Sequence, residues 1–233
     1  MWNQLDFLSR NERFLPPGRF WWVEDGNDGM TIRLHHGDLP AGYAAGDAIA
    51  IDTETLGLVP RRDRLCVVQL SRGDGMADVV QIAPHQTSAP VLQSLLTDRS
   101  ITKLFHYARF DIAILYKTLG ILAEPLYCTK IASKLARTYT DRHGLKDLVK
   151  ELLGVDLSKQ QQSSDWGAPV LSEAQLAYAA SDVLHLHALR AKLDAMLVRE
   201  DRTQYAQAAF AFLPIRAQLD LAGWPETDIF SHD

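Results

Sequence analysis

The chain has 233 residues, of which 47% are hydrophobic, and its formal net charge is −5. This length and apolar content suit one globular domain with a sizeable core, or such a domain with a short extension. Proteins that grip long nucleic acid non-specifically usually carry a basic surplus, because phosphate contacts dominate that affinity. The acidic balance argues against this class, and a polyanionic substrate would have to be short or meet locally concentrated positive charge.

The two cysteines, Cys66 and Cys128, lie in apolar runs and do not form a C-x-x-C spacing. We therefore expect neither a disulfide framework nor a zinc site, and a reducing compartment is the default. No apolar run reaches the length that spans a membrane. Residues 1–23 lack the basic head and long apolar stretch of a signal peptide, so we expect a soluble cytoplasmic protein.

The first 29 residues differ from the rest of the chain. They contain Trp2, Trp21 and Trp22, and no helix or strand period persists in them. One interpretation is a flexible arm that docks through its aromatic rings. We favour the other, in which residues 1–29 are an extension, flexible or foreign to the native protein, before a single domain of residues 30–233.

After Met30 the pattern becomes regular. The apolar run 48–51 ends in Asp52 and suits a central strand buried on both faces. A turn at 72–75 joins two further strands into a hairpin. The predicted strands are 31–34, 48–51, 65–71, 76–82, 103–105 and 126–129.

The predicted helices alternate with the later strands, which indicates a mixed α/β sheet. Gly120 closes one helix, and Ser172 with Gln175 forms a capping box at the start of the last. The predicted helices are 89–97, 108–119, 130–136, 145–153 and 173–199.

Two acids, Asp52 and Glu54, stand at the end of the central strand. In an extended backbone, residues two apart point to the same face, so these carboxylates project side by side. Like charges so placed repel each other unless a cation lies between them. The plain alternative is that the strand has ended and both acids are solvated in a loop.

Three further oxygen-bearing side chains fall on predicted helices. Asp111 lies early in its helix, near the positive end of the helix dipole. Tyr178 and Asp182 are four residues apart and share one helical face. Each has a plain alternative: a first-turn Asp is common, and a tyrosine at the core edge with a surface acid is ordinary.

Together these five residues supply four carboxylates and a phenol on regular elements. Oxygen-rich clusters suit hard divalent cations such as Mg²⁺ or Mn²⁺. Four acids are enough to hold two ions, and such a pair can activate a water and stabilise the leaving oxygen in phosphodiester cleavage. The sequence therefore predicts a phosphodiesterase site of Asp52, Glu54, Asp111, Tyr178 and Asp182.

The order Asp-x-Glu, Asp, Tyr-x-x-x-Asp resembles that of the DEDDy 3′-5′ exonucleases, the ribonuclease D-like family. The resemblance covers most of the chain from Met30 onward, and His143–Lys146 and Gln162–Trp166 are also similar to ribonuclease D segments. Cys128–His143, Ser158–Trp166 and Phe212–Phe230 are similar to short members of the family that degrade dinucleotides.

The resemblance implies an RNase H-like fold with a mixed five-stranded sheet flanked by helices. It implies that Asp52, Glu54, Asp111 and Asp182 bind two metals, with Asp52 bridging. Tyr178 would orient the attacking water. The short members also imply a homo-oligomer, an octamer.

Substrate contacts are predicted outside the metal ligands. In dinucleotide-degrading relatives a leucine at the place of Leu58 wedges between the two bases; the alternative is a leucine packing its loop on the core. Residues 137–143 and 163–166 mix cations, hydroxyls and rings, which suit a terminal phosphate and a base, although both could be solvated loops. His106 would contact the ribose or the phosphate, or merely cap a helix. The predicted substrate-binding residues are Thr53, Thr55, Leu58, His106, Arg137, Tyr139, Arg142, His143, Ser163, Ser164 and Trp166.

The leading hypothesis is an exoribonuclease that hydrolyses short oligoribonucleotides, especially dinucleotides, to nucleoside monophosphates. An alternative with the same chemistry trims the 3′ ends of longer RNA or DNA. A non-catalytic nucleic-acid-binding module is a second class, and clustered carboxylates beside phosphate argue against it. RNA and DNA both stay open, because no residue is identifiable as a reader of the 2′-hydroxyl.

Overall fold

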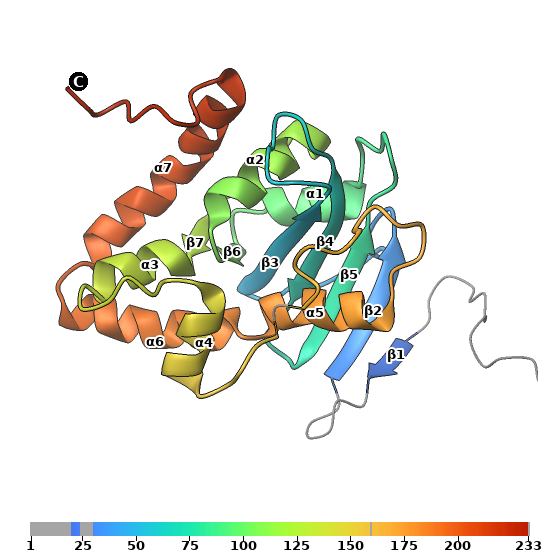
Figure 1. Ribbon diagram of the computed structural model, residues 1–233, viewed down its shortest axis with the longest axis horizontal. Helices are drawn as coiled ribbons and strands as arrows, with labels where there is room; N and C mark the ends of the chain where they lie inside the picture. The colour runs from blue at the N-terminus through green and yellow to red at the C-terminus, as the bar shows by residue number, and fades with distance from the viewer. Residues whose placement is uncertain (1–19, 24–29, 159, 233) are drawn as a thin grey trace, which may run out of the picture.

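The structure, a computed structural model, describes residues 20–23, 30–158 and 160–232. Its strands form one mixed sheet in the order β1-β2-β5-β4-β3-β6-β7. In Figure 1, helix α5 crosses the sheet on the side that faces the viewer, and α1 and α2 lie on the other side. The elements are β1 (Phe20–Val23), β2 (Met30–His36), β3 (Ala48–Thr55), β4 (Leu65–Ser71), β5 (Met76–Gln81), α1 (Pro90–Thr97), β6 (Thr102–Phe105), α2 (Ala108–Leu119), β7 (Leu126–Cys128), α3 (Thr129–Ala136), α4 (Leu145–Leu153), α5 (Glu173–Leu184), α6 (Leu186–Arg199) and α7 (Thr203–Ala222).

Strand β3 lies inside the sheet, between β4 and β6, and sets the position of the site. It pairs antiparallel with β4 and parallel with β6, with Ala50 opposite Leu104. The carboxyl ends of β3 and β6 therefore meet at one edge of the sheet, where ligands bind in open α/β sheets. Asp52 and Glu54 belong to the last half of β3, and His106 directly follows β6.

Burial on both faces of the sheet explains why the strand sequences are continuous apolar runs. Every residue of β4 is buried, because α5 packs on β3, β4 and β5 from one side and α2 contacts β4. A strand covered on both faces cannot alternate apolar and polar residues. Gln69 and Ser71 are the polar residues within β4, and both are fully buried.

Most predicted elements are confirmed, including helices 108–119 and 145–153 with the same bounds. Gly120 ends α2 with a left-handed φ of 69°, and the capping box of Ser172 and Gln175 is present at α5. The sheet has seven strands in the described residues, where the resemblance implies five. The six strands predicted from the sequence pattern are β2 to β7, and β1 adds a seventh at one edge.

The predicted helix 173–199 is wrong as one element. It is broken at His185 into α5 and α6. The first half packs on the sheet, whereas the second packs on α3 and α4, and one straight helix cannot serve both surfaces. Helix α7 is absent from the predicted elements, since Pro214 lies inside it and proline is a helix breaker in sequence patterns.

The predicted boundary at Met30 stays a prediction. Phe20–Val23 pair antiparallel with Met30–Arg33, so at least these four residues of the predicted extension join the sheet. Residues 1–19 and 24–29 lie outside the described residues. Among the described helices, none is both long and apolar enough to cross a membrane.

Candidate active site

The acids of β3 meet an acid of α5 at the carboxyl edge of the sheet. One carboxylate oxygen from each of Asp52, Glu54 and Asp182 can be chosen so that all three lie within 4.8 Å of one another. Asp52 is held from the neighbouring strand, where Gln69 directly opposes it and donates an Nε2 hydrogen bond of 2.9 Å to its Oδ2. The strand has not ended before these acids, so the solvated-loop alternative for Asp52 and Glu54 does not hold.

Asp111 approaches the same cluster from the first turn of α2. Its carboxylate is buried, with 3% of the residue exposed, and accepts a 2.7 Å hydrogen bond from the Thr53 hydroxyl. Thr53 therefore orients an acid, a role that differs from the predicted substrate contact. Burial at this depth separates Asp111 from an ordinary solvated first-turn aspartate.

Tyr178 and Asp182 share one face of α5, as their spacing predicts. Both side chains line the cleft that contains the acids of β3. Burial and the neighbouring carboxylates raise the pKa of Tyr178 well above its ordinary value. The phenol therefore stays protonated near neutral pH and can act as a hydrogen-bond donor.

The electrostatics of the cluster favour a cation. Burial, then repulsion by Asp182 and Asp111, raises the pKa of Glu54 to about 9. Burial also raises the pKa values of Asp111 and Asp182 to about 7, and that of Asp52 well above its ordinary value. Carboxylates packed this closely need protons or positive charge between them, and their all-oxygen donor set fits Mg²⁺ or Mn²⁺.

A cleft of about 530 Å³ contains all five predicted catalytic residues. Its cationic side chains are Lys130 and Lys146, from α3 and α4. Tyr107, at the start of α2, has a left-handed φ of 70°, and the ammonium of Lys130 lies 4.4 Å from the centre of its ring. Such sparsely populated backbone conformations in non-glycine residues cluster at functional sites. The lining residues are Asp52, Thr53, Glu54, Thr55, Leu58, His106, Tyr107, Phe110, Asp111, Lys130, Gly144, Leu145, Lys146, Leu157, Ser158, Gln162, Tyr178 and Asp182.

Four of the predicted substrate-binding residues line this cleft: Thr53, Thr55, Leu58 and His106. Leu58 is 86% exposed, so it does not pack its loop on the core. Burial lowers the pKa of His106 to about 3, and its Nδ1 lies 2.9 Å from the Thr129 hydroxyl. His106 is therefore a neutral side chain at the cleft wall.

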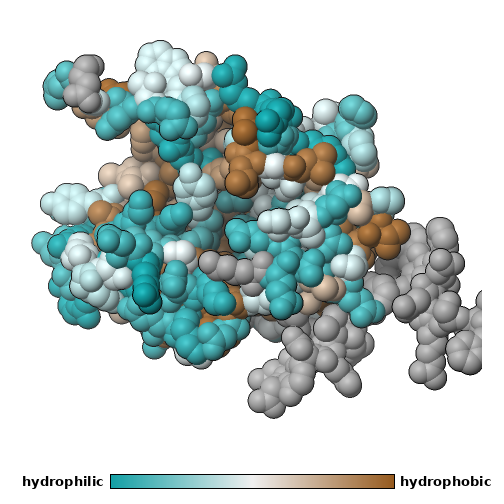
Figure 2. All heavy atoms as spheres, viewed as in Figure 1, coloured by the Kyte–Doolittle hydropathy of each residue, from teal (hydrophilic) through white to brown (hydrophobic). Residues whose placement is uncertain are grey.

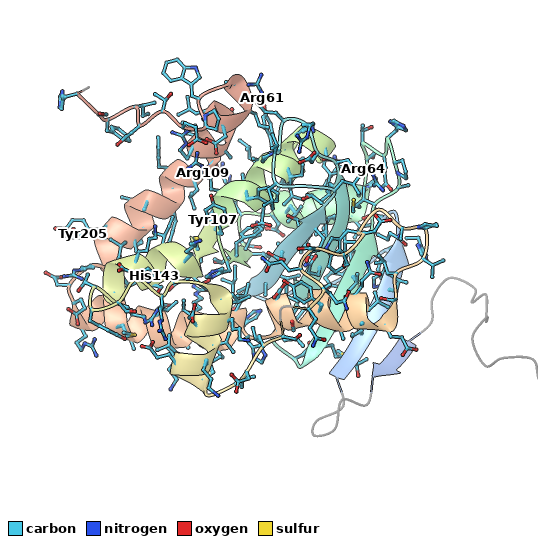
Figure 3. The ribbon with its side chains drawn as sticks, viewed as in Figure 1. Arg61, Arg64, Tyr107, Arg109, His143 and Tyr205 are labelled. Atoms are coloured by element: carbon cyan, nitrogen blue, oxygen red, sulfur yellow. The ribbon has the colours of Figure 1, made fainter. Side chains whose placement is uncertain are left out.

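The predicted phosphate-binding run 137–143 lies outside the cleft lining. Arg137 is fully buried and hydrogen-bonds to Ser133, to the Arg142 carbonyl and to Glu151. Tyr139 donates its hydroxyl to Glu151 at 2.7 Å, and His143 Nδ1 is 2.8 Å from the Ser133 hydroxyl. These side chains join α3 to α4, and Figure 3 shows His143 in that region, apart from Tyr107.

The predicted run Ser163, Ser164 and Trp166 also lies outside the lining. Ser164 closes a turn by donating to the Gln161 carbonyl at 2.8 Å. Trp166 is 2% exposed and packs on Tyr178, with 6.0 Å between ring centroids. Trp166 therefore stands behind a predicted catalytic residue rather than in the cleft.

Several residues of the site are not singled out by the sequence. Gln69 has a visible signal, because it is the one amide in a mostly apolar strand, LCVVQLS. Lys130, Lys146, Ser158 and Gln162 lie in segments that resemble the family, but nothing in the sequence assigns them a role, because polar residues at helix surfaces and in loops are usually solvated. Only the tertiary packing of α3, α4 and the following loop brings these four to the acids.

Known proteins resemble this chain at several levels. Residues 38–198 match the model of a family described as 3′-5′ exonuclease. Ribonuclease D of Gluconacetobacter diazotrophicus is 38% identical over 165 residues, which are 71% of this chain and 42% of that protein. The chain thus spans less than half the length of this curated relative.

Among solved structures, Brucella melitensis NrnC with bound Mg²⁺ is 61% identical, with a TM-score of 0.84 over 88% of this chain and all of that one. The structure of the same protein bound to pGG gives 62% identity and a TM-score of 0.85 over 88% and 100% of the two chains. The predicted similarity to short ribonuclease D-like exonucleases is confirmed.

Proposed function

This chain belongs to the 3′-5′ exonuclease family, and from that premise we propose that it hydrolyses short RNA, above all dinucleotides, from the 3′ end to nucleoside monophosphates. One observation carries the proposal. A single cleft of about 530 Å³ holds the acid cluster, two lysines and the exposed Leu58. That volume falls in the range of small-ligand sites, roughly 300–1,000 Å³.

Asp52, Glu54, Asp111 and Asp182 would hold two divalent cations, Mg²⁺ or Mn²⁺. The 4.8 Å grouping of three carboxylates and the raised pKa values of all four acids support this assignment. When bound, such cations activate a water and stabilise the leaving oxygen of a phosphodiester. The Mg²⁺ bound to Brucella NrnC is a further support.

Tyr178 would orient the reacting groups. It lies four residues from Asp182 on the same face of α5 and lines the cleft with the acids. A protonated phenol can donate a hydrogen bond to the scissile phosphate or position the water, but it cannot accept a proton near neutral pH. The residue would therefore act as a positioned hydrogen-bond donor.

Lys130 and Lys146 would hold the phosphate at the far end of a short substrate. They replace Arg137 and Arg142, the cations that the sequence favours for this role, since the Arg137 guanidinium is fully buried and already bonded. The exposed Leu58 would contact the bases between these lysines and the metal ligands. Local cations then suffice for a polyanionic substrate, in keeping with the net charge of −5.

The pGG bound to Brucella NrnC supports a short substrate. We extend the proposal to a homo-oligomer, an octamer, in which exposed apolar residues such as Tyr205, Ile215 and Phe230 would find cover. A mass measurement of the native assembly tests this part separately.

The decisive experiment is a length series. Initial rates are measured with Mg²⁺ or Mn²⁺ on 5′-phosphorylated RNAs of about two to about seven nucleotides, with pGG as the shortest. We expect kcat/KM to be at least about 10-fold higher for pGG than for the longer RNAs. A longer chain cannot place its 5′-phosphate at the two lysines while its 3′-terminal bond lies at the acids. Comparable values at all lengths would favour an exonuclease that trims longer RNA or DNA. Asp52→Asn is the control for contaminating nucleases.

A further inference from the structure

We propose that Trp166 is a positioning residue: its indole holds the Tyr178 ring in the catalytic orientation without touching the substrate. The inference rests on the proposed function, since it assigns a second residue to the action of Tyr178. The two rings lie 6.0 Å apart between centroids with an interplanar angle of 41°. Trp166 is 2% exposed and does not line the cleft, whereas Tyr178 does.

The contribution of Trp166 comes from its ring and not from hydrogen bonding. Its indole Nε1 is buried and has no hydrogen-bond partner within the described part of the chain. Tilted aromatic pairs at this separation stabilise each other beyond simple burial. A phenylalanine would therefore keep the relevant contact, and an aliphatic side chain would lose it.

The loop that carries Trp166 is fixed from three elements. Gln175, in the first turn of α5, donates to the Asp165 carbonyl at 3.0 Å. Gln81 of β5 donates to the Ala168 carbonyl at 2.8 Å, and Arg64, just before β4, donates to the Gly167 carbonyl at 3.4 Å. Figure 3 shows Arg64 beside the sheet. The backbone on both sides of the indole is thus anchored to the sheet and to the helix of Tyr178.

The same loop touches the segment that carries Leu58. A Cβ on Gly167 would come within 2.7 Å of Leu56 Cδ2 and within 3.2 Å of Arg64 Nη2. The Leu58 segment, Gly167, Trp166 and Tyr178 therefore form one continuous line of contacts. These contacts connect the Leu58 segment, which would contact the bases, to Tyr178, which would orient the water.

The test is a double-mutant cycle with pGG at saturating Mn²⁺. Variants Trp166→Leu, Trp166→Phe, Tyr178→Phe and Trp166→Leu/Tyr178→Phe are compared for kcat, KM and thermal unfolding. We expect Trp166→Leu to lower kcat by about 10- to 100-fold with KM nearly unchanged, as a misplaced catalytic group does. Trp166→Phe should stay within a few-fold of wild type. In the Tyr178→Phe background, Trp166→Leu should cost almost nothing further.

Two results would overturn the inference. One is an equal loss of kcat from Trp166→Leu with and without Tyr178, which would mean that the indole acts on the fold in general. The other is a rise in KM at constant kcat, which would mean that it contacts substrate. If Trp166→Leu does not fold, Trp166→Met, which also removes the aromatic ring, takes its place in the same cycle. Inactivity of the wild type on every RNA would instead refute the proposed function.

Discussion

Asp52, Glu54 and Asp182 bring carboxylate oxygens within 4.8 Å of one another in a partly buried cluster. Burial and repulsion raise the pKa of Glu54 to about 9, and burial raises those of Asp111 and Asp182 to about 7. The cation-free protein must therefore take up protons here as it folds. Cation binding releases them, because a metal ligand must be deprotonated.

The raised pKa values of these acids set the sign of the pH effect on folding stability. Acids whose folded pKa exceeds the unfolded value bind extra protons in the folded state, so stability is lost as pH rises between the two values. Without metal, we expect the unfolding temperature to fall from about pH 5 to about pH 9. Added Mn²⁺ should raise it more at the higher pH. Thermal scans in EDTA and in Mn²⁺ check this, and equal metal stabilisation at both pH values would contradict it.

Gln69 supports the cluster from the neighbouring strand. It is fully buried, and its Nε2 donates to Asp52. Groups that orient a metal ligand in this way typically change metal affinity by about 10- to 100-fold when removed. We expect Gln69→Leu to weaken the apparent Mg²⁺ affinity by that factor, with most of kcat recovered at saturating Mg²⁺. A metal titration of activity measures it, and an unchanged midpoint would remove Gln69 from the site.

At the scale of elements, α2 is tied to α7 by a shared carboxylate. Asp220 accepts two hydrogen bonds from Arg109, at 2.6 and 2.8 Å, and two from Arg216, at 3.0 and 2.6 Å. The same arginines donate to the carbonyls of Pro225 and Thr227 in the segment after α7. Figure 3 shows Arg109 in this region and Arg61 beside the end of α7. Arg109 lies two residues before Asp111, so this clamp also fixes the start of the helix that carries Asp111.

We expect Asp220→Asn to lower the free energy of unfolding by about 3 kcal/mol, because two arginines would face an uncharged amide in a largely buried setting. The matched control is Asp156→Asn. Asp156 pairs with Lys150 at the surface, where an ion pair contributes about 1 kcal/mol or less. Urea denaturation of both variants measures the difference. Equal effects would show that the clamp does not stabilise α7.

At the scale of the whole molecule, the charge balance and the surface fit a short substrate. The net charge is −5, and Figure 2 shows a mostly hydrophilic face with separate small hydrophobic patches. Binding of RNA would then depend on the two lysines of the cleft rather than on a basic stripe. Each phosphate contact adds to the salt dependence of binding.

We expect Lys146→Gln to lower kcat/KM for pGG and to make its dependence on log salt shallower by about 1 unit. The control is Lys192→Gln, which makes the same charge change at an exposed position of α6 outside the cleft lining. Rates over a salt series measure both slopes. The same shift in slope for the two variants would mean that net charge, and not the cleft lysine, governs the effect.

The sequence by itself determined the family, the α/β class and the five catalytic candidates. Strand and helix periods fix which side chains share a face, so the spacing alone pairs Asp52 with Glu54 and Tyr178 with Asp182. Buried strands also read plainly, as β4 does over residues 65–71. These features are local, and local backbone geometry is what sequence patterns encode.

Only the tertiary structure decided which polar residues face the cleft. In the sequence, Arg137 and Lys146 both look like cations that could bind a substrate. In the structure, Arg137 is fully buried against Glu151, whereas Lys146 lines the cleft. The break at His185 and the pairing of β1 are likewise invisible in the sequence, since both depend on which distant surface a segment packs against. The direction of a polar side chain is set by packing between elements, and no local period records it.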